Sequence, residues 1–294
     1  VYAVMSHNSH VLVVAALTAL AGLLWALRRP RGPVPKWALG AGVLAVALGL
    51  LGSAAFGLMV AHKYGKGPIT PPFLTARVIA DGPGRRFIET RCPSAGFEVC
   101  RYAARLPADV DEFLWAGAPT GVFETATPQS RRALAQEQTR FAAAVFFAYP
   151  LEQTQASLGN ALRQLVNVEL EDFRYKPSVR ATLAQQLPEP HRRRMLATRA
   201  AADAWPLAFL QGWQGFVAIA AFLLMPRNRR GETLSDDQRH AAAFAWLVVA
   251  GVLINAGVCG AFSALHGRYE ARVMWLLPLA VYAQALLLTE PGRS

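Results

Sequence analysis

The stretch Trp37–Ala61 reads WALGAGVLAVALGLLGSAAFGLMVA and contains no charged side chain. An α-helix rises about 1.5 Å per residue, so about 20 apolar residues cross the hydrocarbon core of a bilayer. A helix without a polar face has nothing to present to water. The segment is therefore predicted to span a membrane.

Further runs along the chain have the same apolar character. They are Val11–Leu27, Trp205–Met225, Ala241–Phe262 and Arg272–Leu288. Ser235-Asp236-Asp237-Gln238 precedes the third of these as a capping box, which is typical of a helix start. The fold class predicted from these runs is all-α. We expect a polytopic α-helical membrane protein with five spanning helices and one mainly helical extramembrane domain.

The composition agrees with a membrane protein. Of the 294 residues, 53% are hydrophobic and 17% are charged, and the mean hydropathy is +0.25. Soluble domains are about 45–50% apolar and about 25% charged. These values exclude a disordered chain, a disulfide-knotted toxin and a simple soluble enzyme. The net charge of +11 is not accompanied by an RNP, zinc-finger or helix-turn-helix pattern, so we expect no nucleic-acid partner.

Much of the positive charge lies in two short loops beside apolar runs. These cations are Arg28, Arg29, Arg31, Lys36, Arg227, Arg229, Arg230 and Arg239. Clustered cations beside spanning helices are typical of the cytoplasmic side. The predicted division is 1–61 with two spans, 62–204 as an outer domain, and 205–294 with three spans and a short cytoplasmic tail. Fewer cations flank the opposite side, namely Lys63, Lys66, Arg268 and Arg272.

Residues 1–10 contain no positively charged n-region, so the sequence does not begin with a secretory signal peptide. Val1 is not an initiator methionine. We expect a fragment of a longer polytopic protein, and translation from Met5 is the alternative.

The segment 62–204 is predicted to be mainly helical. Asp109 and Thr127-Pro128 are typical of helix starts, and Pro150 separates two helices. The second of these helices has an apolar stripe at helical spacing, made of Leu151, Leu158, Leu162, Leu165, Val166, Leu170 and Phe173. The turn Asp81-Gly82-Pro83-Gly84 is flanked by short helices or, as the alternative, by a hairpin.

Cys92 and Cys100 lie close together in the sequence of this segment. In an oxidising periplasm such a pair is expected to form a disulfide. Two buried free thiols are the alternative. The spacing is not that of a zinc site, so we expect no metal.

A basic collar is the main candidate binding site. His266, Arg268, Tyr269 and Arg272 lie in a short outer turn, and Lys63 and Lys66 follow the second span. Arginine presents a fork of donors that matches phosphate. These six residues are predicted to bind a lipid headgroup, with anionic or polyprenyl-phosphate lipids as partners. Interfacial anchoring by snorkelling cations and aromatic side chains is the alternative.

Polar side chains also occur inside the predicted spans. Gln211 and Gln214 share a helix face, and Asn255 lies in the predicted span Ala241–Phe262. We interpret them as interhelical hydrogen-bonding groups, with a substrate path as the alternative. The small-residue pairs Ser53/Gly57 and Ala256/Gly260 indicate close helix contacts.

The segment His266–Pro278 resembles the H/D-R-Y-x-x-R-x-x-W-L-x-P pattern found near the C-terminus of a family of polytopic membrane proteins in Alphaproteobacteria. Pro72–Arg86 and Cys92–Tyr102 are similar to the same family, which has no assigned activity. The resemblance covers most of residues 70–290. It implies a multi-pass protein of the bacterial inner membrane with residues 62–204 in the periplasm.

We therefore expect an accessory protein of cell-envelope biogenesis that presents a helical periplasmic domain and needs no cofactor. A fragment of a polyprenyl-phosphate-dependent glycosyltransferase is one alternative, and a transporter is another. The sequence names no protein partner and no catalytic residue.

Overall fold

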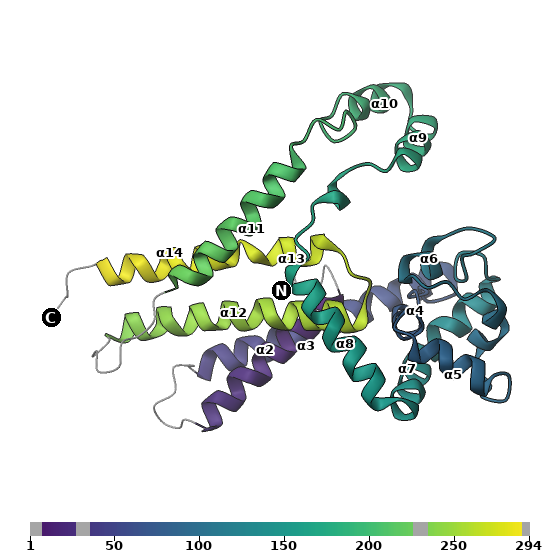
Figure 1. Cartoon of the computed structure of the whole chain (residues 1–294), viewed down its shortest axis with the longest axis horizontal. Coiled ribbons are helices and arrows are strands. Elements are labelled where there is room, and N and C mark those ends of the chain that lie inside the picture. The colour runs from purple at the N-terminus through teal and green to yellow at the C-terminus, as the bar shows by residue number, and fades with distance from the viewer. Residues whose placement is uncertain (1–7, 28–35, 226–234, 290–294) are drawn as a thin grey trace. The chain divides into compact units, whose positions relative to one another are not determined.

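The computed structural model describes residues 8–27, 36–225 and 235–289, and every regular element in these ranges is a helix (Figure 1). The chain forms two compact units. The first comprises Val1–Arg163 with Ile254–Leu265, and the second comprises Gln164–Leu253 with His266–Ser294.

Among the described residues, four helices are long and apolar enough to cross a membrane. They are α2 (Asn8–Leu27), α3 (Lys36–Tyr64), α11 (Leu207–Leu224) and α12 (Asp236–Phe262). The prediction of an apolar helix long enough to span a membrane is confirmed in these four places. Most of the arginine-rich loop residues lie outside the described residues, namely Arg28, Arg29, Arg31, Arg227, Arg229 and Arg230.

In the first unit, α2 and α3 pack closely where Gly42 faces Thr18. A Cβ atom on Gly42 would lie 2.3 Å from the Thr18 hydroxyl oxygen, so a larger residue there would require Thr18 to shift. By contrast, a Cβ atom on Gly57 would meet nothing within 4 Å, and the predicted role of Gly57 in a close helix contact is not seen among the described residues.

The helices that follow form one apolar core within the first unit (Figure 1). They are α4 (Phe73–Ala80), α5 (Pro83–Arg91), the 3₁₀ helix η1 (Glu98–Arg105), α6 (Val110–Trp115) and α7 (Pro128–Ala148). The predicted caps are present, since Asp109 accepts a bond from Glu112 N and Thr127 accepts one from Ser130 N. The helical alternative for the flanks of the Asp81–Gly84 turn is confirmed.

The next helix, α8 (Pro150–Val166), differs from the others. Its leucines at 151, 158 and 162 are exposed, whereas Gln153, Asn160 and Gln164 are buried. Leu151, Leu158 and Leu162 do not join the apolar core of either unit, whereas Leu165 is partly buried against the core of the second unit. Because α8 ends at Val166, the predicted stripe is not carried by one helix, and Leu170 and Phe173 lie beyond it at η2.

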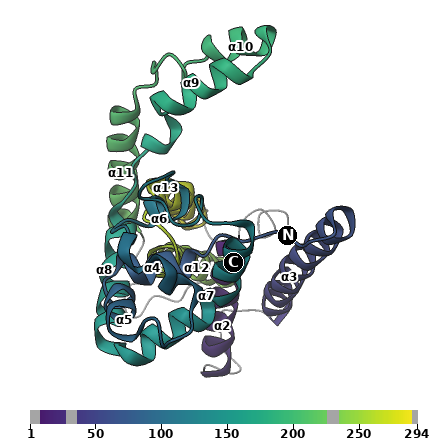
Figure 2. The same ribbon diagram turned by 90° about the vertical axis from the view of Figure 1, so that its right-hand side faces the viewer.

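The second unit contains the 3₁₀ helix η2 (Glu171–Phe173), α9 (Pro177–Gln186) and α10 (Glu189–Leu196). Helices α9 and α10 pack against each other and precede α11 (Figure 2). Within this unit, apolar side chains of α11 and α12 pack with those of α13 (Gly267–Met274) and α14 (Leu276–Thr289).

The fifth predicted span, Arg272–Leu288, is not one helix. It is interrupted at Trp275, and α14 has 14 residues, which at 1.5 Å per residue is short of a bilayer core. Pro278 has no N–H to donate to the carbonyl of Met274, where α13 ends. Five spans are therefore not confirmed.

Candidate functional site

The short helix α13 follows α12 in the chain and is fixed through its first residues. A Cβ atom on Gly267 would lie 2.1 Å from the carbonyl oxygen of Glu169, so the two backbones meet directly. The Gln164 amide donates to the carbonyl of His266 (2.9 Å) and accepts from its N–H (3.2 Å). These contacts hold the start of α13 against the segment after α8.

Asp172 of η2 faces the same helix start. One carboxylate oxygen lies 3.6 Å from His266 Nδ1, and the other lies 3.4 Å from a guanidinium nitrogen of Arg268. A half-exposed pair of this kind contributes little to stability, but it restricts where the guanidinium points.

Tyr269 organises the cations of α13. Its ring is buried, and the guanidinium groups of Arg268 and Arg272 each lie 5.2 Å from the ring centroid. The imidazole of His266 meets the ring edge at 5.3 Å. Cations over an aromatic face are attracted by its quadrupole, so the ring positions both arginines.

The helix is also tied to α11. Gln214 of α11 donates to the carbonyl of Ala271 (3.0 Å), and Trp275 Nε1 donates to the carbonyl of Arg272 (2.8 Å). Glu270 is fully buried in the same helix. The bond from Gln214 supports the interpretation of this glutamine as an interhelical hydrogen-bonding group.

His266, Arg268, Tyr269 and Arg272 lie together at the start of α13. Lys63 and Lys66 belong to the first unit, where Lys63 lies over the ring of Tyr64. The six predicted residues are therefore not one cluster within either unit. The roles of Asp172 and Gln164 could not be predicted from the sequence, because neither is near α13 in sequence and neither belongs to a recognisable motif.

The cluster can bind an oxyanion. The side chain of Arg268 is 46% exposed and is positioned by Tyr269 and Asp172. A guanidinium held in this way presents parallel N–H donors to a phosphate without first ordering its own side chain.

A second polar cluster lies in the first unit, between α4 and α8. Arg77 and Asp81 form a buried ion pair of 2.8 Å, and Asp81 also accepts hydrogen bonds from Gln153 and Asn160, each of 2.7 Å. Arg77 donates to the carbonyl of Ser263 at 3.4 Å. Because the carboxylate is surrounded by protein donors, we interpret this cluster as a structural anchor for α8.

A cavity of about 430 Å³ lies in the second unit, beside α9 and α10. Arg174, Arg180 and Asp203 contribute its charged lining, and Arg174 pairs with Asp203 at 2.8 Å. The basic run His191–Arg194 is part of α10, where Arg192 and Arg193 pair with Glu189. Arg192 and Arg193 therefore have an acidic partner in their own helix.

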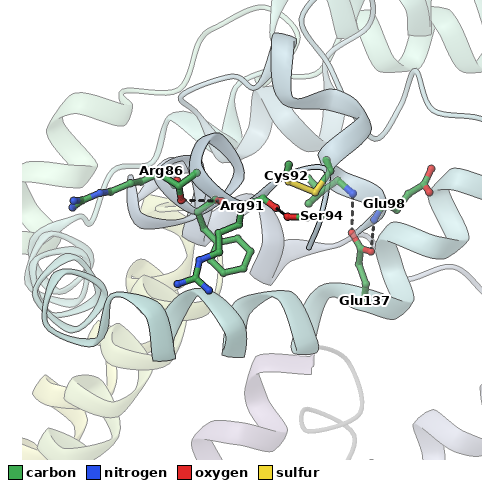
Figure 3. Close-up of a disulfide and its surroundings, with 10 residues drawn as sticks. Arg86, Arg91, Cys92, Ser94, Glu98 and Glu137 are labelled. Atoms are coloured by element: carbon green, nitrogen blue, oxygen red, sulfur yellow. Dashed lines mark hydrogen bonds between the residues drawn. A yellow bond between two sulfur atoms is a disulfide. The ribbon is translucent and has the colours of Figure 1, made fainter. Parts of the chain in front are cut away.

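The disulfide Cys92–Cys100 is formed, with a Cα–Cα distance of 5.5 Å (Figure 3). Beside it, the carboxylate of Glu137 accepts from the backbone N–H groups of Glu98 (2.7 Å) and Val99 (2.9 Å), which begin η1. Burial raises the pKa of Glu137 above its ordinary value of 4.5, and the two N–H donors oppose this shift.

Within residues 8–27, 36–225 and 235–289, no group of three His, Cys, Asp or Glu side chains is arranged to hold a metal ion. No protein-family model, curated protein or solved structure matches the chain. The resemblance to the alphaproteobacterial membrane proteins therefore stays a prediction.

Proposed function

We propose that this chain is an accessory protein of the bacterial inner membrane that binds the phosphate of an anionic lipid at α13. The observation that carries the proposal is the placement of Arg268 and Arg272 over the one ring of Tyr269, with Arg268 half exposed. In the chain, α13 connects the candidate span α12 to the apolar helix α14. A headgroup phosphate is the anion available at such a boundary.

The same proposal places residues 62–204 in the periplasm. The disulfide Cys92–Cys100 supports this placement, because disulfides persist in oxidising compartments. The four apolar helices support insertion in a membrane. A tag within 62–204 is expected to be digested by protease added to spheroplasts, and a tag that stays protected would contradict this orientation.

Binding can be measured with detergent-solubilised full-length chain and two soluble phosphate probes, dihexanoyl phosphatidic acid and geranyl phosphate. Dihexanoyl phosphatidylcholine, whose zwitterionic headgroup has no net charge, is the control. Arg268→Ala is expected to weaken binding of the preferred probe about tenfold or more, since it removes a charge-assisted contact. Arg268→Lys keeps the charge but loses the fork, and an intermediate affinity is expected.

The matched control is Arg105→Ala, because Arg105 is an exposed arginine that lies 5.1 Å from the ring of Tyr102. It is expected to leave the affinity unchanged. Equal affinities in wild type, Arg268→Ala and Arg105→Ala would exclude a phosphate site at α13. The ratio between the two probes distinguishes a glycerolipid from a polyprenyl phosphate. No geometry in the described residues favours the glycosyltransferase or transporter alternative.

A further inference from the structure

Helix α8 is inverted with respect to a helix of a water-soluble domain. At about 100° per residue, Leu151, Leu158 and Leu162 share one face and Gln153, Asn160 and Gln164 share the opposite face. The leucine side chains are 84%, 62% and 67% exposed, whereas Gln153 and Asn160 are 5% and 3% exposed. Over residues 151–162 the leucines therefore point away from the protein and the amides at 153 and 160 point into it, whereas Leu165, at the end of the same stripe, is partly buried against the apolar core of the second unit.

The amide face is held in place by hydrogen bonds. Gln153 and Asn160 each donate to the buried carboxylate of Asp81 at 2.7 Å, and Asp81 is paired with Arg77. If α8 rolled to cover its leucines, both bonds to a buried charge would be lost. The exposure of the leucine face is thus a fixed property of this unit.

The depth of α8 relative to a bilayer follows from one close contact. A Cβ atom on Gly260 would lie 2.7 Å from the backbone nitrogen of Ala161, so the end of α12 touches the middle of α8 without an intervening side chain. Gly260 is close to the end of the 26-residue candidate span Asp237–Phe262. Such a helix is about 39 Å long and the hydrocarbon core about 30 Å, so its end lies at the headgroup boundary.

We propose that α8 is an interfacial helix whose leucine face inserts into the bilayer at the boundary between headgroups and acyl chains. Lipid is the partner that fits the leucine face, because α8 contacts the end of a candidate membrane span at Gly260. Phe262, next to the contact at Gly260, is itself 49% exposed. Side chains that lie at this depth and point outward meet lipid, and an apolar face of this kind inserts about 5–10 Å. The inference is independent of the phosphate site at α13.

The test uses the full chain in phosphatidylcholine vesicles with a single bimane label. The background variant is Cys259→Ala, in which the remaining cysteines are joined as a disulfide. Labels at Leu158→Cys and Leu162→Cys are compared with labels at two exposed polar positions, Arg163→Cys on α8 and Gln129→Cys on α7. Each variant must keep the circular dichroism spectrum and elution volume of the parent.

At positions 158 and 162, bimane is expected to lose most of its fluorescence to a spin-labelled lipid quencher and little to aqueous iodide. At positions 163 and 129, aqueous iodide is expected to quench the bimane more than the lipid quencher does. Iodide quenching at 158 and 162 equal to that at 129 would place the leucine face in water and overturn the proposal. Protection from both quenchers would also overturn it, because a second copy or another protein would then cover the face.

Discussion

Helices α7 and α8 follow one another in the chain and both have an apolar stripe at helical spacing, yet the two stripes have opposite environments. In α7, Leu134, Phe141 and Val145 are completely buried. In α8, Leu151, Leu158 and Leu162 are exposed, whereas Gln153, Asn160 and Gln164 are buried. The period of a stripe therefore identifies a face of a helix, but it does not identify what covers that face.

The largest expected effect comes from truncating the two stripes in turn. Phe141 packs edge-on against Phe87 and Phe97, so Phe141→Ala is expected to lower the free energy of unfolding by about 3–5 kcal/mol. Leu158→Ala leaves no cavity in either core and removes only the contact of the leucine side chain with lipid, so its expected cost is smaller, about 1–2 kcal/mol. Denaturant unfolding in vesicles, followed by circular dichroism, measures both. Equal losses would show that protein covers the α8 stripe.

Much of the architecture could be predicted from the sequence because its causes are local. The apolar stretch Trp37–Ala61 contains enough residues to span a bilayer, and it lies within α3. Ser235 and Gln238 exchange side chain–backbone bonds at the start of α12, as the capping box predicted. Such features depend on neighbouring residues alone.

The remainder depends on contacts between distant residues. The partners of His266 are Gln164 and Asp172, which are about a hundred positions away in the chain. The inversion of α8 did leave a signal, because its buried face consists of uncharged amides at 153, 160 and 164. A solvent-exposed polar face usually contains lysine and glutamate, so amides at helical spacing indicate a buried polar face.

A smaller effect tests the polar anchor of α8. Asn160→Ala removes one of the amide donors to the Asp81 carboxylate and is expected to lower the free energy of unfolding by about 1.5–3 kcal/mol. The matched control is Gln129→Ala, an exposed amide at the start of α7 in the same unit, for which little change is expected. The measurement is again denaturant unfolding. A cost for Asn160→Ala no larger than that for Gln129→Ala would contradict the anchoring role of Asp81.

The smallest expected effect concerns Glu137 of α7. Its acidic side chain is buried, whereas the leucines at 151, 158 and 162 of α8 are exposed. Burial raises the pKa of Glu137, and the negative charge of Glu98 acts in the same direction, whereas Arg140 and the N–H groups of Glu98 and Val99 lower it. A carboxyl whose pKa is higher in the folded state binds more protons there than in the unfolded state. Its contribution to stability is therefore present below pH 4.5 and is lost as pH rises through the folded pKa.

The comparison of wild type with Glu137→Gln isolates this group. The wild type is expected to lose stability relative to the variant as pH rises from about 4 through the folded pKa. Unfolding curves at a series of pH values, with the difference between the two proteins plotted against pH, measure the effect. If the stability of the wild type relative to the variant rises with pH instead, the two N–H bonds lower the pKa of Glu137 by more than burial raises it. Glu137 would then be an ordinary ionised cap of η1, and the interior around α7 would tolerate charge as readily as the amide face of α8 does.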